Sequence, residues 1–329
     1  MGDLHVISRP RLGALAASAL LFAGLLAGCS SSDDESAGGT VQLNLPDGRS
    51  VTIPDTPERI VTLGDQWTDV VLSFGETPVG YYDYSKSATG EMQPWYGEKL
   101  ADATFVDPTK GDDATTIAKL NPDLIFAPGF ASDSPEFQQI SKLAPTVNAI
   151  SDQEIDPWQD MVTVMGTVLH DPEKAKSIID DTNAKIAAVA QEYPDLKGKT
   201  YAFAFMYGND QLSVLGDEND GAGKLFTSLG MKMAPKLVAE YQRTGQPRFG
   251  LSTENIPMLD ADVLVVATAT PEQAETLKSL PGYKNLKAVK DNAVTFMTQS
   301  QITGLNAPTP NSIPYVLDLL KPSFAAASN

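Results

Sequence analysis

The stretch PEKAKSIIDDTNAKIAAVAQEY, residues 172–193, decides the fold that we expect for this chain. Asp171 is a suitable N-cap in front of it, and Pro172 suits the first helical position. The apolar side chains recur at the three- and four-residue spacing of one helical face: Ala175, Ile178, Ile179, Ile186, Val189, Ala190 and Tyr193. Pro194 follows, and no glycine interrupts the stretch. We predict one helix roughly 30 Å long, at about 1.5 Å per residue.

Two similar segments flank this helix, ATTIAKLNPDLIFAPG at residues 114–129 and STENIPMLDADVLVVAT at residues 252–268. Each reads as a short amphipathic helix, a polar link and a continuous apolar run, which is typical of a parallel strand buried on both faces. Each half of the chain also begins with a strand that leads into a helix, at residues 60–63 and 200–206. The pattern predicts an α/β fold: two three-layer α/β lobes with mostly parallel sheets, joined by one long spine helix.

The chain of 329 residues has room for two domains, and 42% hydrophobic residues are enough to build their cores. We expect a signal peptide at 1–28, a flexible tether at 29–40, a first lobe at 41–157, connecting and spine helices at 158–196, and a second lobe at 197–329. Ligands bind beyond the carboxyl ends of parallel strands and in clefts between domains. We therefore expect the site in the crevice between the lobes.

The N-terminus has the pattern of an exported protein. Arg9 and Arg11 precede an apolar stretch at 12–26, which is too short to span a membrane. The stretch ends in Leu-Ala-Gly-Cys, which resembles the lipobox of a lipoprotein, with Cys29 as the lipidated residue. The alternative is an ordinary secretory signal. Because Cys29 is the only cysteine, we expect no disulfides.

The charge excludes some partners and leaves others. The net charge of the chain is −18, and it becomes −19 without residues 1–28, which hold two arginines and one aspartate. Such a chain lacks the basic surface that nucleic acids require, and anionic membrane surfaces would repel it. We expect attachment to the membrane through the lipid on Cys29 alone.

The residue types also weigh against catalysis and against direct metal binding. After residue 28 the chain has one histidine, His170. A Ser-His-Asp site needs a histidine that has no structural role, and zinc or manganese sites use several histidines. We expect His170 to be a structural residue at a helix end. An exported hydrolase that uses a pair of carboxylates stays open as a different class of function, as does a purely structural lipoprotein.

Several segments in this order resemble one known family. They are the hairpin turn Asp47-Gly48, PERIVTL at 57–63, LNPDLIFAP at 120–128, the helix from Pro172, and LSTENIPMLDADVLVVA at 251–267. Together they resemble the substrate-binding lipoproteins of ABC importers for ferric siderophores, haem and cobalamin. The resemblance implies a monomeric, extracytoplasmic binding protein, not an enzyme, that captures a ferric siderophore and delivers it to the permease. Haem or cobalamin is the alternative ligand. No cofactor is implied, because iron would enter only as a chelate or as haem, and haem would need a tyrosine ligand.

The resemblance also implies a glutamate on each lobe that docks on the permease. Glu254 occupies that position in the second lobe, although an acid at the start of a helix also has a purely structural use. In the first lobe the matching residue is Thr115, and Asp112 or Asp113 could supply the charge instead.

A ferric chelate already fills the coordination shell of iron, so the cleft needs aromatic faces and hydrogen-bonding groups. We expect them in five places: the loop after the first strand, a strand at 78–84 and the loop after it, the loop at 207–210, a polar loop at 241–250, and the loop at 298–306. The candidates are Asp65, Gln66, Trp67, Tyr81, Tyr82, Tyr84, Trp95, Tyr96, Tyr207, Asn209, Arg243, Arg248, Gln299 and Gln301. The structural alternative for Trp67 is a place in the core. The structural alternative for the two arginines is pairing with surface carboxylates. Hydroxamate, catecholate and carboxylate chelates all fit this composition, as does haem.

Overall fold

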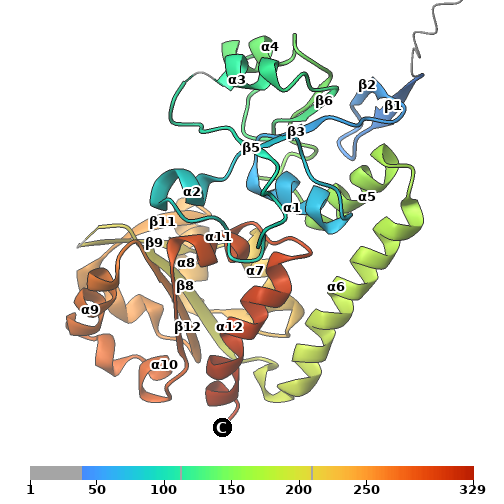
Figure 1. Ribbon diagram of the computed structural model, residues 1–329. Coiled ribbons are helices and arrows are strands. Elements are labelled where there is room, and N and C mark those ends of the chain that lie inside the picture. The colour runs from blue at the N-terminus through green and yellow to red at the C-terminus, as the bar shows by residue number, and fades with distance from the viewer. Residues whose placement is uncertain (1–38, 112, 209) are drawn as a thin grey trace, which may run out of the picture. The chain divides into compact units, whose positions relative to one another are not determined.

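The long helix is present as α6 (Pro172–Glu192), with the side chain of Asp171 accepting a hydrogen bond from the backbone nitrogen of Lys174. The structure is a computed structural model that describes residues 39–111, 113–208 and 210–329. The predicted signal peptide, Cys29 and residues 29–38 of the predicted tether lie outside the described residues. In Figure 1, α6 runs along one side of the structure from α5 (Trp158–Val168) to the second lobe.

The first lobe contains a five-stranded sheet in the order β5-β4-β3-β6-β7, and every pair of neighbours is parallel. Its strands are short: β3 (Ile60–Thr62), β4 (Gly80–Tyr81), β5 (Thr104–Phe105), β6 (Leu124–Phe126) and β7 (Thr146–Val147). Its helices are α1 (Asp65–Ser73), α2 (Tyr84–Thr89), α3 (Asp113–Lys119) and α4 (Pro135–Ile140). The predicted hairpin is β1 (Thr40–Asn44) paired with β2 (Ser50–Pro54).

The second lobe contains the sheet β11-β9-β8-β12-β13, with β10 beside the start of β8. Strands β8, β10, β12 and β13 are parallel, whereas β9 and β11 are antiparallel to their neighbours. The strands are β8 (Thr200–Met206), β9 (Gln211–Leu215), β10 (Lys232–Met233), β11 (Arg248–Ser252), β12 (Val263–Thr268) and β13 (Val294–Met297). The helices are α7 (Gly221–Ser228), α8 (Pro235–Thr244), α9 (Pro271–Ser279), α10 (Lys287–Lys290), α11 (Gln299–Asn306) and α12 (Ser312–Ala327), with short 3-10 turns η1 (Pro194–Leu196), η2 (Thr253–Leu259) and η3 (Tyr283–Asn285). These two sheets confirm the predicted fold class.

The corner between α5 and α6 depends on two backbone features. A β-carbon at Gly166 would lie 2.5 Å from the β-carbon of Ala175, so only glycine lets the helices approach this closely. His170 lies at the corner with a φ of 53°, and its Nε2 is 2.6 Å from the backbone oxygen of Asp55. The histidine therefore ties the spine to the end of β2.

Three local predictions were wrong, because a helix occupies part of each stretch where we expected another structure. The expected strand at 78–84 ends at Tyr81, because the carboxylate of Asp83 caps α2 by accepting from the nitrogen of Lys86. The expected loop at 298–306 is α11, which begins with a capping box of Thr298 and Gln301. The expected polar loop at 241–250 is instead divided between α8, the left-handed Gly245 and β11.

Candidate functional site

Helices that follow the carboxyl end of one strand in each sheet meet between the lobes: α2 follows β4, and α11 follows β13. The hydroxyl groups of Ser85 on α2 and Ser300 on α11 are 2.6 Å apart, which joins the lobes directly. Figure 1 shows α2 of the first lobe above α11 of the second. We use the name inter-lobe face for the residues at or just after the carboxyl ends of β4, β6, β8, β12 and β13, namely residues 82–84 and 128–130 of the first lobe and residues 207, 268–270 and 298–301 of the second.

Two tyrosines present open aromatic surface on the inter-lobe face, one from each lobe. Tyr84 and Tyr207 are both 48% exposed, and they are the only large exposed hydrophobic side chains among the residues that the structure describes. Tyr84 extends over Gly129, where an added β-carbon would lie 3.6 Å from the tyrosine hydroxyl. The hydroxyl of Tyr207 donates to Oε1 of Gln211 at 2.8 Å. Both residues are candidates for ligand contact from the sequence, and their exposure leaves the rings free to stack on a bulky ligand.

Four of the other predicted aromatic contacts are buried in the first lobe. Trp67 is stacked on Phe126 with ring centroids 4.0 Å apart and has no exposed surface, so the structure assigns it to the core. Tyr96 donates to the backbone oxygen of Asp65 at 3.0 Å, and Tyr82 donates to the carboxylate of Asp113. Tyr81 accepts from Nζ of Lys86 at 3.0 Å. Burial of these rings leaves them no face for a ligand.

Trp95 lies between the lobes instead of in an open loop. Its ring centroid is 5.6 Å from that of Tyr315 on α12, and its ring lies against Gly304 on α11. This indole therefore supports the joint between the lobes.

Both predicted arginines are already paired within the second lobe. Arg248 is 25% exposed, and its guanidinium donates to both carboxylate oxygens of Asp220 at 2.7 and 3.1 Å and to Asn306 at 3.0 Å. Arg243 donates to Glu240 one turn earlier on α8, at 2.9 Å from Nε, and this bond lowers the pKa of Glu240. The structural alternative therefore describes both side chains in this conformation.

The polar candidates have different places. Gln66 spans the lobes, with its Nε2 at 3.3 Å from the backbone oxygen of Pro308. Gln301 caps α11 and donates to the hydroxyl of Tyr315 at 3.0 Å, so its amide is structural. Gln299 is half-buried as the first residue of α11, on the inter-lobe face. Asn209 lies outside the described residues.

Carboxyl groups gather at the seam behind the inter-lobe face. Burial, and then the charge of Asp83, raise the pKa of Asp65 to about 8. Burial raises the pKa of Asp69 to about 6, although hydrogen bonds from Asn311 oppose the shift. Asn311 donates from Nδ2 to Oδ1 of Asp69 at 2.7 Å, which is a second direct bond between the lobes.

The sequence analysis missed the residues of this joint, namely Ser85, Ser300, Asp69 and Asn311. A signal existed for one of them: Asp69 is a lone carboxylate on the apolar face of α1, between Trp67 and Val70. A buried acid in such a place needs a partner. The partner itself is more than 200 residues away in the sequence, and only the fold identifies it.

The predicted docking residues differ in how they present their charge. Glu254 is exposed at the start of η2, where the hydroxyl of Ser252 caps the turn. Thr115 is exposed on α3. Asp113 is turned inward, since one of its oxygens accepts from Tyr82 and the other is buried. Asp112 lies outside the described residues.

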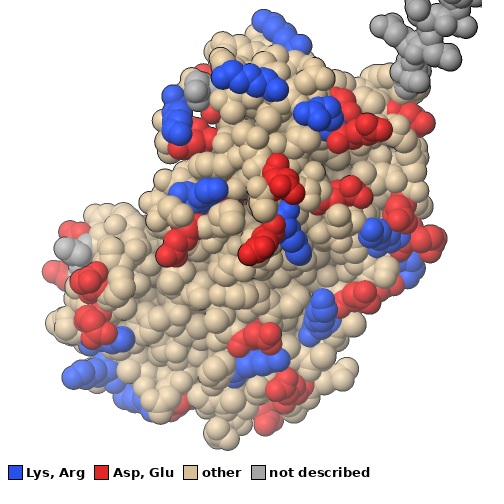
Figure 2. Space-filling view, in the orientation of Figure 1, with Lys and Arg blue, Asp and Glu red and all other residues tan. Residues whose placement is uncertain are grey.

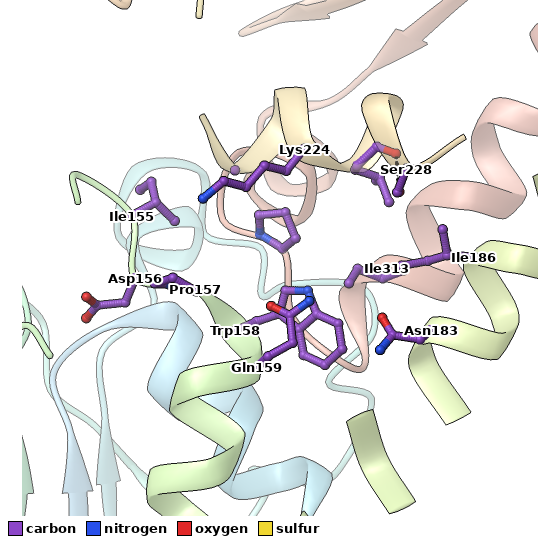
Figure 3. A pocket seen from close by; sticks show the side chains of 13 residues that line it. Ile155, Asp156, Pro157, Trp158, Gln159, Asn183, Ile186, Lys224, Ser228 and Ile313 are labelled. Carbon is purple, nitrogen blue, oxygen red and sulfur yellow. Dashed lines mark hydrogen bonds between the residues drawn. The ribbon is translucent and has the colours of Figure 1, made fainter. Parts of the chain in front are cut away.

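A separate pocket of about 170 Å³ lies beside the spine, among α5, α6, α7 and α12. Figure 3 shows Trp158 and Ile313 on its wall and Lys224 with Ser228 on the opposite side. Pockets for drug-sized ligands have volumes of about 300–1,000 Å³. This pocket is therefore too small to be the cleft for a siderophore.

The described residues contain no group of three or more His, Cys, Asp or Glu side chains arranged to hold a metal ion. Within the same residues no helix combines the length and the apolar character needed to cross a membrane. Figure 2 shows basic and acidic side chains interspersed on the face that it presents, and some of both kinds lie where the two lobes meet.

Comparisons with known proteins agree with this architecture. The chain is 29% identical over 277 residues to a probable siderophore-binding lipoprotein, YfiY, of Bacillus subtilis, which covers 79% of this chain and 81% of the relative. It is 29% identical over 254 residues to the iron(3+)-hydroxamate-binding protein YxeB of the same organism, covering 74% of each chain. The crystal structure of Staphylococcus aureus SirA complexed with staphyloferrin B is similar with a TM-score of 0.71 and 25% identity, covering 87% of this chain and 99% of SirA. Residues 60–300 match the family described as periplasmic binding protein, so the chain belongs to that family and is a solute-binding protein, not an enzyme.

Proposed function

We propose that this protein captures a ferric siderophore on the inter-lobe face and delivers it to the permease of an ABC importer. The observation that carries the proposal is the position of Tyr84 and Tyr207, which offer an aromatic face from each lobe beside the carboxyl ends of the two sheets. Relatives named for siderophore and iron-hydroxamate binding support the same ligand class. Iron would reach the protein only as a chelate, so no protein ligand to iron is needed.

The arginines favour a particular kind of chelate. Four arginines lie in the described residues, and each guanidinium is bonded to groups of the protein itself: Arg49 to Asp47, Arg59 to the backbone oxygen of Leu120, Arg243 to Glu240, and Arg248 to Asp220. To pair with a guanidinium group, a polyanionic carboxylate chelate would have to break one of these pairs, against a net charge of −18. A trishydroxamate chelate of ferric iron is electrically neutral and has no such cost. We therefore propose hydroxamate chelates as the preferred ligands.

The test is a fluorescence titration with ferrichrome, a carboxylate siderophore and haem. We expect ferrichrome to quench tryptophan emission, and Tyr84→Ala and Tyr207→Ala each to weaken binding about tenfold, or about 1.4 kcal/mol. Tyr84→Phe and Tyr207→Phe are the matched controls, because they keep the stacking ring, and we expect them to bind as the wild type does. If both alanine variants keep full affinity, the assigned face is wrong. If only haem quenches the emission, haem replaces the siderophore as the proposed ligand, and the exposed tyrosines become the candidates for coordinating its iron.

We also propose that the protein is anchored outside the cytoplasm by a lipid on Cys29. Relatives named as lipoproteins support this, together with the lipobox-like sequence before Cys29. In cells fed a labelled fatty acid, the wild type should incorporate label, and Cys29→Ala should lose it, because the chain has no other thiol. Label that persists on the variant would contradict the proposed anchor.

A further inference from the structure

A small cavity lies inside the seam, behind the inter-lobe face, and we name it the seam cavity. Its walls come from both lobes: Asp65, Asp69, Gln93, Trp95 and Tyr96 from the first, and Thr303, Ala307 and Thr309 from the second. Its volume is about 10 Å³. This is close to the smallest volume that admits one water molecule, about 10–15 Å³.

Four polar atoms on the wall from the first lobe have no hydrogen-bond partner among the described protein groups. They are Oδ2 of Asp69, Nε1 of Trp95, and both Nε2 and Oε1 of Gln93. The indole of Trp95 and the hydroxyl of Thr309 lie near enough to the carboxylate of Asp69 to lower its pKa, but neither has the geometry of a hydrogen bond to Oδ2. Asp69 and Gln93 are each only 1% exposed, so bulk water does not reach these groups. Buried polar atoms without partners are rare in native proteins, because each retains the cost of its desolvation. A cluster of four around one cavity therefore indicates a bound molecule.

We propose that the seam cavity binds a single water molecule that donates to Asp69, accepts from Trp95 and bonds to the amide of Gln93, and that this water completes the joint between the lobes. The mixture of groups identifies the class of ligand. A cation in the cavity would meet the N–H group of Trp95, and an anion would meet the carboxylate of Asp69. Water donates and accepts at once, and it suits Gln93 whichever way the amide is turned.

The direct bonds of Asp69 explain why the water lies at a joint. Asn311 of the second lobe donates to Oδ1 and to the backbone oxygen of Asp69, at 2.7 and 3.2 Å. Oδ2 remains for the cavity. The opposite wall is the segment from α11 to α12, so the cavity exists only when the lobes are together. The water thus supplies the hydrogen bonds that the protein groups at this joint do not provide for one another.

The test uses Gln93→Met, which keeps the length of the side chain and removes both amide atoms. If a water is bound, the variant takes away one of its partners, and the thermal unfolding midpoint of the ligand-free protein should fall by about 2 °C or more. Without a water, the variant would remove two unsatisfied atoms and would be as stable as the wild type or more stable, which overturns the proposal. Gln246→Met, at an exposed loop position, is the control for the substitution itself and should leave the midpoint unchanged.

A high-resolution crystal structure of the wild type keeps the proposal testable if Gln93→Met does not fold. We expect density for one water within hydrogen-bonding distance of Asp69 Oδ2 and Trp95 Nε1. No density there, or an ion with metal-like distances to oxygen, would overturn the proposal. Both experiments use the ligand-free protein, so their outcome is independent of the proposed siderophore.

Discussion

Three carboxyl groups lie at the seam between the lobes, and one lysine side chain lies beside them. Asp65, Asp69 and Asp83 lie close together, and Lys86 on α2 is the basic residue that faces Asp83. Tyr84 and Tyr96 are the other titratable groups around Asp65, and the segment from α11 to α12 places the amide of Asn311 and the hydroxyl of Thr309 there. Burial raises the pKa of all three carboxyl groups. The folded protein therefore holds protons at a pH where the unfolded chain has released them.

This arrangement predicts that the buried carboxyl groups make the fold less stable as the pH rises from about 4 to about 8, with Asp65 alone responsible above pH 6. The pKa of Asp65 is raised to about 8 and that of Asp69 to about 6, from 3.8. Because the folded state binds more protons, the free energy of unfolding should fall as pH rises, by up to about 1.4 kcal/mol per pH unit for each proton. Denaturant unfolding at several pH values measures this slope. Asp65→Asn should flatten it above pH 6, whereas Asp102→Asn, at an exposed position, should not. A slope that is equal in both variants would contradict the prediction.

At the scale of residues, the sequence predicted which side chains lie near the cleft but not which of them are free. Tyr81, Tyr82 and Tyr84 look alike in the sequence, yet only Tyr84 is exposed, because Asp83 begins a helix there. The pairing of Arg248 with Asp220 joins residues 28 positions apart, and no local pattern reveals it. Exposure and pairing are properties of the folded lobe.

At the scale of elements, the spine and the paired segments were predictable because their signals are local and repeated. A cap, a proline at the first position and a continuous apolar face define α6 within one stretch of sequence. The α11 helix had a local signal as well, since Thr298 and Gln301 form the T-x-x-Q pattern of a capping box. The expectation of a loop at 298–306 takes no account of this pattern. The contact of α11 with α2 across the seam has no local signal.

The contact of α11 with the first lobe predicts a steric effect at Gly304. A β-carbon there would lie 2.6 Å from Cη2 of Trp95 and 2.9 Å from the β-carbon of Ser312. Alanine is normally better than glycine inside a helix by about 1 kcal/mol. In this place Gly304→Ala should instead destabilise the protein by about 1–3 kcal/mol through overpacking, as measured by denaturant unfolding.

A double-mutant cycle identifies the origin of that loss. In the background of Trp95→Ala the clash with the indole is absent, so Gly304→Ala should cost less there than in the wild type. Thr303→Ala, one residue earlier on the same helix, controls for a general effect on α11. Equal losses in both backgrounds would show that Trp95 does not press on the helix.

At the scale of the whole molecule, the acidic net charge has different consequences for ligand binding and for docking on a partner protein. A protein with a net charge of −18 gains nothing from long-range attraction to an anionic chelate, but it suits a docking partner with basic residues. Glu254 is exposed on the second lobe and has no salt-bridge partner among the described residues. Thr115 holds the matching place on the first lobe without a charge. Under the proposed delivery to a permease, the two lobes would present unequal charge at these two positions.

This asymmetry predicts opposite effects of two substitutions on uptake. Glu254→Ala should slow the uptake of radioactive iron from ferrichrome severalfold, because a charged contact at the rim of an interface chiefly sets the rate of association. The affinity for ferrichrome, measured on the purified protein, should not change, since Glu254 is exposed at the start of η2 and is not among the residues assigned to the ligand. Thr115→Glu adds the missing acid and should raise uptake, also without changing affinity. Glu173→Ala, an exposed acid on the spine, is the control and should alter neither quantity. A large loss of affinity in Glu254→Ala would place this residue in the cleft and not at the permease.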